Sequence, residues 1–502
     1  MIPLRGQAGP DWNRAMHPVD MIFFWAKAKP HHPAIIQSDM VVTYKGLAEA
    51  IEAISFRIAR YEFDPHEPVA ILIESAAKLL AVTFALLKTG LIAAPVYRGL
   101  LPFLRGAGIK HLISTGAGQV LSGGRNIRFD DTWLQNVSIP SGAKVQGRSG
   151  ASYPDVIFFT SGTTGMPKKY IQSCEGFLER MRTAVLRESD ETSRTLILPG
   201  APSSFGFNHA CEMLHAGKTA CFTSLDENVL AFIGAYRVDA IVASPQQILT
   251  LVNLVEKGAG QFQLDSLKSI RLGGGLISKT LARRIKASLC PHMTIIYGST
   301  EAGNMAFANY DAIANIPDAV GFVPPWVQME IVDDSGAVLP PETEGYIRCR
   351  TPIFAKHFAA NNPDAKADAR EAWWHPGDLG RLTRNGMLCV SGRGGDVINC
   401  GGNKVSAAVL EEALLSLAGI KDAGICGVMG DSGINEVWIG VVPETEIEIL
   451  KLRQQIERKQ EFNAPVDEIF VVTKIPRNEL GKIKRRELQE MLLSLKKPSV
   501  SP

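Results

Sequence analysis

Strand-like apolar runs that alternate with helical segments fill the first two-thirds of this sequence and constrain its fold most strongly. Residues 69–73, 156–159 and 240–243 are short apolar runs, and residues 77–88 and 246–257 have the periodicity of helices. Continuous apolar runs are typical of strands buried on both faces, and strands spaced by helices form βαβ units. The pattern therefore predicts an α/β fold with largely parallel sheets.

A different pattern begins after about Gly321. Between residues 327 and 352 apolar and polar residues alternate, and turn sequences occur at 334–336 and 344–345. Alternation interrupted by short turns is typical of antiparallel hairpins. We therefore expect a small antiparallel region in this part of the chain.

The length and this change of pattern together predict the domain organisation. The chain has 502 residues, and a domain commonly holds about 150 residues, so two or three units are expected. A glycine-dense segment at 392–402 precedes a further mixture of helix-like and strand-like segments. We predict a large N-terminal domain, residues 1–392, and a small C-terminal α+β domain, residues 393–502.

Composition excludes several classes of protein. Lys and Arg number 53 against 51 Asp and Glu, which gives a net charge of +2. We expect no nucleic-acid partner, because proteins that bind nucleic acids usually carry a strong positive field.

Lys88, Gly90 and Pro95 interrupt the most apolar stretch, 79–96, so we expect no membrane span. The eight cysteines are scattered without a CxxC pair, which favours buried free thiols over a metal site and indicates a cytoplasmic protein.

The most informative segment, 160–168, directly follows a strand-like run. Its glycines allow a tight turn that points backbone N–H groups at an anion, and its hydroxyl side chains and lysine add donors and positive charge. It is not a Walker A loop, because Met166 and Pro167 follow Gly165. A surface turn is the alternative to a polyphosphate-binding loop. The binding residues that we assign are Thr160, Ser161, Gly162, Thr163, Thr164, Gly165 and Lys168.

This loop resembles the phosphate loop of the adenylate-forming superfamily, which includes acyl-CoA and aryl-CoA synthetases, carrier-protein adenylation domains and beetle luciferase. Four further segments resemble motifs of that family and occur in its order. The segment Tyr297-Gly298-Ser299-Thr300-Glu301 is similar to the YGxTE motif, and Trp374 to Gly380 is similar to the aromatic-x-TGD motif, with Pro376 in place of threonine. The segment Ser391 to Ile398, followed by Gly401-Gly402 and Glu411-Glu412, is similar to the GRxxDxI hinge motif. Gly481 to Arg486 is similar to the C-terminal GK motif.

The resemblance implies roles for residues at the first of these motifs. Glu301 would hold Mg²⁺, Thr300 would contact phosphate, and Tyr297, beside Gly298, would stack on adenine. The run Gly273, Gly274 and Gly275 would border adenine and the acyl pocket. Read without the family, a glutamate after a strand is usually a solvated charge, and a tyrosine there is as often part of the core.

Later motifs complete the implied site. The resemblance implies that Asp378 bonds both ribose hydroxyls and that Arg393 contacts ribose or phosphate, although a turn aspartate is by default structural. Lys482 would bridge the substrate carboxylate and the phosphate, where a cation offsets the repulsion between two anions. Its alternative is a solvated basic face. Gly394 and Gly395 stand at the hinge, about which family members rotate a small mobile C-terminal domain.

The implied chemistry is a carboxylic acid activated by ATP and Mg²⁺ to an acyl-adenylate, followed by transfer to the thiol of CoA. Two alternatives stay open, namely an enzyme that loads a carrier-protein thiol and a non-catalytic nucleotide-binding relative. The segment 191–225 lacks an aspartate of the kind that binds an amino-acid substrate, so we expect an acyl or aryl acid. Candidate pocket residues are Ser203, Phe205, Ser244 and Met305, with Phe207, Asn208 and Gln246 as further possibilities.

Overall fold

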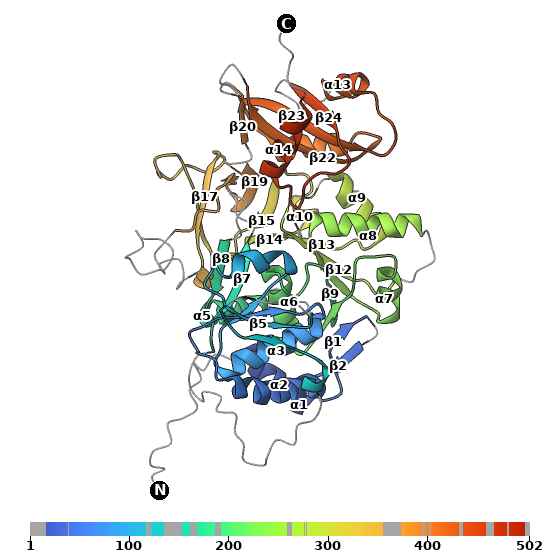
Figure 1. The fold of residues 1–502 in the computed structure, drawn as a ribbon. Helices are drawn as coiled ribbons and strands as arrows, with labels where there is room; N and C mark the ends of the chain where they lie inside the picture. Colours follow the sequence, from blue (N-terminus) through green and yellow to red (C-terminus); the bar gives the residue numbers. More distant parts are fainter. Residues whose placement is uncertain are drawn as a thin grey trace. The chain divides into compact units, whose positions relative to one another are not determined.

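The structure is a computed structural model that describes residues 17–38, 40–116, 121, 123–134, 153–160, 168–185, 192–258, 264–275, 277, 279–354, 373–393, 397–400, 403–430, 435–457, 466–478 and 481–496. The chain divides into two compact units (Figure 1). One consists of residues 1–159 and 169–224, and the other of residues 160–168 and 225–502.

The first unit is built on parallel strands, as predicted. Six strands form a sheet in the order β6-β5-β3-β4-β7-β8, in which the pairs from β6 to β7 are parallel. Elsewhere in this unit β9, β10 and β1 are parallel neighbours, and β2 pairs antiparallel with β1. The strands are β1 (Pro33–Gln37), β2 (Met40–Thr43), β3 (Val69–Leu72), β4 (Ala93–Pro95), β5 (His111–Ser114), β6 (Asn126–Arg128), β7 (Val156–Thr160), β8 (Lys168–Gln172), β9 (Arg194–Ile197) and β10 (Thr219–Phe222).

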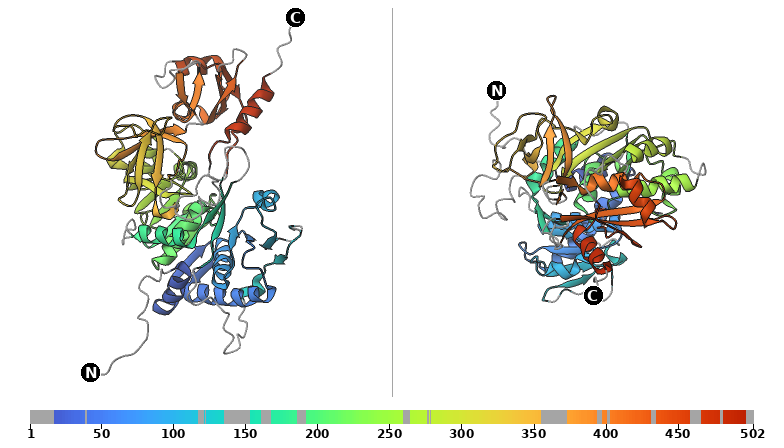
Figure 2. Two further views of the ribbon diagram at one scale, coloured as in Figure 1. Left: turned by 90° about the vertical axis from the view of Figure 1, so that its left-hand side faces the viewer. Right: turned by 90° about the horizontal axis from the view of Figure 1, so that it is seen from above.

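Helices of the first unit bury apolar faces on these strands, and α1, α2 and α3 lie together (Figure 2). The sequence marks α3 clearly: the Ser75 side chain accepts the Lys78 N–H at its start, and Gly90 ends it with a φ of +85°. Ile51, Leu80 and Phe84 from these helices are fully buried. The helices are α1 (Pro18–Ala28), α2 (Tyr44–Ile58), α3 (Ala76–Thr89), α4 (Leu101–Leu104), α5 (Cys174–Val185) and α6 (Ser204–His215).

The second unit begins with parallel strands and continues with antiparallel ones. β11, β12 and β13 are parallel, and the neighbours from β13 through β14, β15, β19, β18 and β17 to β16 are antiparallel. The elements are α7 (Val229–Ala235), β11 (Ala240–Ala243), α8 (Pro245–Lys257), β12 (Ser269–Gly273), α9 (Lys279–Ser288), β13 (Met293–Ser299), β14 (Gly303–Asn309), α10 (Tyr310–Ile313), β15 (Ala319–Phe322), β16 (Gln328–Val332), β17 (Gly345–Arg350), β18 (Asp378–Leu382) and β19 (Met387–Arg393).

The C-terminal part of this unit carries two small sheets. β20 pairs with β21, while β22, β23 and β24 form a three-stranded sheet against which α14 packs (Figure 2). The elements are β20 (Val397–Cys400), β21 (Asn403–Ser406), α12 (Ala407–Leu415), β22 (Ile420–Met429), β23 (Asn435–Pro443), α13 (Ile449–Glu457), β24 (Glu468–Val471) and α14 (Arg485–Leu495).

The predicted fold class is therefore confirmed, with one difference in position. Antiparallel pairing begins at β14, before the change of pattern near Gly321, because the chain reverses within Thr300–Ala302 and pairs Ser299 with Gly303. The domain boundary at 392 stays a prediction. In the described part of the chain no helix combines the length and the apolar character that a membrane span requires.

Candidate active site

The carboxyl ends of β11, β12 and β13 meet at one edge of the second unit because the three strands are parallel and adjacent. Ser244 follows β11, the glycines 273–275 close β12, and Gly298 lies near the end of β13. Pairing places Gly273 opposite Ile296, the residue before Tyr297. In open α/β sheets ligands bind at such carboxyl ends.

Two positions at this edge require glycine. A Cβ on Gly298 would lie 2.4 Å from the carbonyl oxygen of Gly303, so no side chain fits there. Gly274 has a φ of +87°, in the left-handed region that other residues rarely adopt. Both glycines are therefore required by the fold, because the Gly303 backbone fills the space beside Gly298 and Gly274 adopts a left-handed conformation.

Tyr297 and Asp378, which lie 81 positions apart, are joined directly. The Tyr297 hydroxyl donates a hydrogen bond of 2.6 Å to Oδ2 of Asp378, and only 7% of Asp378 is exposed. A carboxylate has about four acceptor positions, so this bond is compatible with further donors such as ribose hydroxyls. Arg393 pairs with Asp378 across β18 and β19, which brings its backbone beside the carboxylate, while its side chain lies outside the described residues.

Thr300 and Glu301 form the reversal between β13 and β14, and both are partly exposed. The Ser299 hydroxyl accepts the N–H of Ala302, and Thr351 donates to the Ala302 carbonyl, so the turn is held from both sides. Among the described residues, no group of three or more His, Cys, Asp or Glu lies together. A lone carboxylate fits a magnesium ion that is held mainly by phosphate oxygens and water.

Lys482 lies in a tight turn that contacts the same edge. A Cβ on Gly481 would lie 2.4 Å from Cβ of Gln246, so the backbone beside Lys482 packs closely on the first turn of α8. Pro245, also in that turn, lies 3.2 Å from the position that a Cβ on Gly275 would occupy. The lysine turn therefore packs on the first turn of α8, and the first turn of α8 packs on the glycines at the end of β12.

The predicted phosphate loop is described only at its ends. β7 ends at Thr160 and β8 begins at Lys168, on neighbouring strands of the six-stranded sheet. Residues 161–167, which include Ser161, Gly162, Thr163, Thr164 and Gly165, and the side chains of Thr160 and Lys168 lie outside the described part of the chain. The hinge residues Gly394 and Gly395 also lie outside it. Their assigned roles stay predictions.

The candidate pocket residues have structural roles that the sequence did not reveal. Ser203 and Ser244 cap α6 and α8, and each hydroxyl accepts a backbone N–H. Met305 is fully buried, with its sulfur 3.3 Å from Sγ of Cys349. Phe205 is partly buried and meets the ring of His209 edge-on, with ring centroids 4.8 Å apart.

Two of the further possibilities in the first unit belong to its interior. Phe207 is fully buried against the rings of Phe84, Phe158 and Phe177. The Asn208 side chain exchanges hydrogen bonds with Gln172, at 2.9 and 3.1 Å. Ring packing accounts for the position of Phe207 and side-chain hydrogen bonds account for that of Asn208, so neither position requires a ligand.

The cysteine side chains that the structure describes are buried. Seven of the eight cysteines are buried free thiols in the described structure, as predicted. Burial raises the pKa of Cys349 to about 12 and that of Cys174 to about 11. A thiol with so high a pKa is a poor nucleophile near neutral pH.

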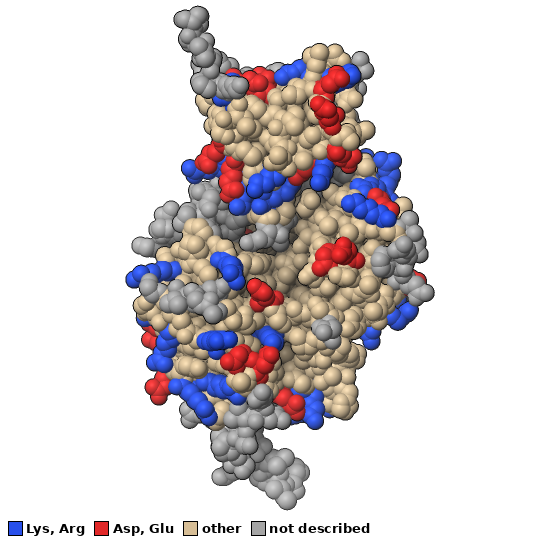
Figure 3. Space-filling view, turned by 45° about the vertical axis from the view of Figure 1, so that its right-hand side comes forward, with Lys and Arg blue, Asp and Glu red and all other residues tan. Residues whose placement is uncertain are grey.

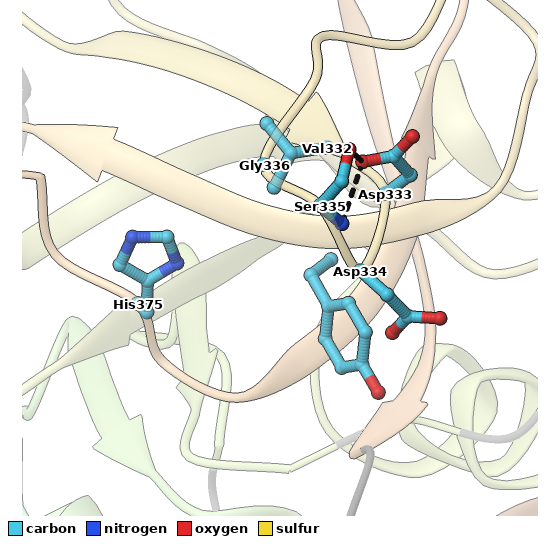
Figure 4. Close-up of a pocket in the computed structure, with 7 residues that line it drawn as sticks. Val332, Asp333, Asp334, Ser335, Gly336 and His375 are labelled. Carbon is cyan, nitrogen blue, oxygen red and sulfur yellow. Dashed lines mark hydrogen bonds between the residues drawn. The ribbon is translucent and has the colours of Figure 1, made fainter.

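A cavity of about 380 Å³ lies on the β16–β17 hairpin (Figure 4). Asp333 there accepts hydrogen bonds from the N–H and the hydroxyl of Ser335, at 2.9 and 2.7 Å. This is a self-contained turn, so its acidic residues give no sign of a metal site. The cavity is lined by Val332, Asp333, Asp334, Ser335, Gly336, Tyr346 and His375.

The sequence does not predict two arginine–carboxylate pairs that lie near Lys482. Arg477 bonds Asp422, and Arg485 bonds Glu411, across separations of 55 and 74 positions. In the sequence, Glu411 and Arg485 belong to two different motifs. No local pattern could have joined such distant residues.

Comparison with known proteins identifies a family model and several relatives that this chain resembles. The family model described as AMP-binding enzyme matches residues 22–358. The salicylyl-CoA synthase / salicylate adenylyltransferase of a Streptomyces species is 23% identical, over 93% of this chain and 92% of that protein. The fatty acid–[acyl-carrier-protein] ligase ScoC of Streptomyces coeruleorubidus is 26% identical, over 95% of this chain and 98% of that protein.

A solved structure shares the fold. The o-succinylbenzoate coenzyme A synthetase MenE from Bacillus subtilis, in complex with ATP and magnesium ion, superposes with a TM-score of 0.77. The match covers 93% of this chain and 98% of that one at 21% identity. This likeness therefore concerns the fold alone.

Proposed function

Because the chain belongs to the AMP-binding enzyme family, we propose that it joins a carboxylic acid to the thiol of CoA through an acyl-adenylate. In the first step a carboxylate oxygen attacks the α-phosphorus of ATP, and the bond to pyrophosphate breaks. In the second step the thiol sulfur, having lost its proton, attacks the acyl carbon, and AMP leaves with the electrons of the broken C–O bond. Both steps use groups of the substrates and need no nucleophile from the protein.

One observation carries the proposal most directly. Gly481 packs on Gln246, and the contacts continue through Pro245 to Gly275, so Lys482 and the strand ends that carry Tyr297 belong to one continuous surface. An ammonium group here would lie between two anionic substrates and offset their repulsion as charge develops in the transition state. Asp378, held by Tyr297, would receive the ribose hydroxyls.

Magnesium would be held at Glu301 together with phosphate oxygens, where it would neutralise charge on the departing pyrophosphate. We assign the glycines 273–275 and Gly298 to the adenine side, since they lie at the carboxyl ends of the parallel neighbours β12 and β13. The acid itself is proposed only as an acyl or aryl carboxylate.

Loading of a carrier protein is the second candidate, and the match to ScoC over almost the whole chain favours it. The two candidates share the adenylation step and differ in the thiol that accepts the acyl group. Measuring pyrophosphate release with Mg-ATP over a panel of acyl, benzoic, cinnamic and amino acids, with and without CoA, separates them. Acyl-CoA supports the ligase, and adenylate that accumulates despite CoA supports the carrier protein. No turnover with any acid, while nucleotide still binds, supports the non-catalytic nucleotide-binding relative.

Substitution of the lysine tests the mechanism. Lys482→Ala should slow adenylate formation by about a hundredfold or more, because the charge acts in the transition state. Thioester formation from supplied acyl-adenylate should be nearly unchanged. Lys474→Ala removes an exposed lysine from the same region and is the matched control. Equal loss of both half-reactions in the Lys482 variant would contradict the role.

A further inference from the structure

Arg477 is connected to two separate parts of the C-terminal region. Its Nε and Nη2 donate to the two carboxylate oxygens of Asp422, at 3.1 and 2.6 Å. Its Nη1 donates to the carbonyl oxygen of Gly481 at 2.6 Å, and that carbonyl belongs to the peptide bond that links Gly481 to Lys482. One guanidinium therefore joins β22 to the backbone that carries the lysine.

The rest of the turn is closed by backbone contacts. The N–H of Lys482 donates to the Asn478 side chain, and the N–H of Asn478 donates to the Lys482 carbonyl, both at 2.8 Å. Arg477 also pairs with Ile483 in an isolated antiparallel bridge. These bonds give the turn its shape, but they lie inside it and do not orient it on the sheet.

Asp422 is suited to fix the arginine. The β22–β23 pairing shifts register between Ile420 and Asp422, and Oδ1 of Asp422 also accepts the N–H of Ala423 at 2.8 Å. A two-pronged arginine–carboxylate pair restricts direction as well as distance. The Asp422 carboxylate thus holds the guanidinium plane so that its remaining edge faces Gly481.

We propose that Arg477, fixed by Asp422, is a positioning residue that sets the location of Lys482 for the adenylation step. This inference rests on the proposed function. Side-chain exposures of 21% for Arg477 and 26% for Asp422 leave the pair open to solvent screening. Such a pair contributes little to stability, so its loss should affect adenylation more than folding.

Three variants separate positioning from a general structural role. Arg477→Gln removes the bridge, and Arg477→Lys keeps one charge without the two-pronged geometry. Arg453→Gln is the control, because Arg453 likewise donates to backbone carbonyls, those of Val466 and Asp467, which lie outside the lysine turn. Each full-length variant is assayed for pyrophosphate release with the panel acid on which the unsubstituted enzyme is most active, for thioester formation from that acyl-adenylate, and for thermal unfolding.

Adenylation should fall roughly tenfold to a hundredfold in Arg477→Gln, since displacing a reacting group by about 1 Å has an effect of that order. Arg477→Lys should recover part of the rate. Thioester formation and the unfolding temperature should change little in both, and Arg453→Gln should leave the ratio of the two half-reactions unaltered. Full adenylation by Arg477→Gln, or an equal loss in both half-reactions, overturns the inference.

A measurement without substrate keeps this inference distinct from the proposed function. Hydrogen exchange followed by mass spectrometry should show roughly tenfold or faster exchange in the peptides that span 476–484 of Arg477→Gln, because the turn loses the hydrogen bonds that join it to Asp422 of β22. Unchanged exchange in those peptides overturns the inference. If the unsubstituted enzyme forms no adenylate with any acid while exchange changes as expected, the proposed function fails but the attachment stands. Should Arg477→Gln not fold, Asp422→Asn is read by the same assays.

Discussion

The first unit and the C-terminal sheet near Lys482 both have apolar cores, but ion pairs between distant segments distinguish the C-terminal sheet. In the first unit Phe207 contacts the rings of Phe84, Phe158 and Phe177 at centroid distances of 5.3–6.2 Å. Around the C-terminal sheet the distinctive contacts are ion pairs, Glu411–Arg485 and Asp422–Arg477. Apolar packing stabilises without fixing direction, whereas ion pairs specify where a loop lies.

The charged side chains on the surface bear on the same comparison. Blue and red side chains are interspersed over the face drawn in Figure 3, without one sign covering it, as the net charge of +2 leads one to expect. Charge in this protein therefore acts through particular pairs rather than through a field of one sign. The following substitutions test that contrast.

Phe207→Ala should have the largest effect on stability. Removing a fully buried ring leaves a cavity that its neighbours cannot fill, and the free energy of unfolding should fall by about 4 kcal/mol in urea titrations. Phe24→Ala, at a position that is 52% exposed, is the control and should change it little. A small effect at Phe207 would instead indicate that this residue faces a ligand pocket, as the sequence alone allowed.

Arg485→Met should lower the free energy of unfolding by about 3 kcal/mol, because it leaves the buried Glu411 carboxylate without its main partner. The same urea titration on the double variant with Glu411→Leu should recover part of the loss, since no unpaired charge then remains. Arg486→Gln removes an exposed arginine that pairs with Glu490, and it should have little effect. If the single and double variants were equally unstable, the buried charge would not be the cause.

Asp378→Ala should raise the KM for ATP roughly tenfold to a hundredfold, the usual consequence of losing hydrogen bonds to a charged group. Steady-state kinetics at saturating acid measure the change. Asp334→Ala, in the exposed hairpin turn, is the control. Unchanged ATP dependence in the Asp378 variant would refute the ribose assignment.

The smallest expected effect is a dependence of stability on pH. Burial, and to a lesser degree the nearby His215, lowers the pKa of His17 from 6.5 to about 3, and its Nδ1 accepts the N–H of Val19. The unfolded chain therefore binds a proton that the folded chain does not, and stability falls as pH drops below 6.5. Relative to neutral pH, the free energy of unfolding at pH 5.5 should be lower by about 1 kcal/mol.

His17→Asn tests this effect, because asparagine also caps helices but does not titrate. Urea titrations at pH 7.5 and pH 5.5 should show that the variant loses less stability between these values than the unsubstituted chain does. An identical loss in the two chains would show that His17 is not the group responsible.

Much of the fold could be predicted from local pattern. Runs such as 240–243 became buried parallel strands, and helices began and ended at caps that the sequence displays, such as Ser75 and Gly90. Antiparallel pairing at β14 was missed because its short reversal, Thr300–Ala302, has no glycine or proline to mark it. Long-range pairing, not local propensity, decided that strand.

The sequence predicted which residues belong to the candidate site but not how they contact one another. Motif order identified Tyr297, Asp378 and Lys482 as parts of one family pattern, but nothing in the sequence states that the Tyr297 hydroxyl bonds Asp378. Ser203 and Ser244 illustrate the opposite case, because a serine at a strand end can cap a helix or contact a ligand, and only coordinates reveal the capping bonds. Local residue type leaves both options open.

The sequence by itself determined the order of strands and helices, the glycine-rich turns and the residue types that adenylation requires, because these depend on neighbours along the chain. Tertiary structure decided which distant groups meet: Gly481 with Gln246, Arg477 with Asp422 and Arg485 with Glu411. Such contacts depend on how sheets and helices pack in three dimensions. Short-range periodicity carries no information about that packing, and the candidate site depends on it.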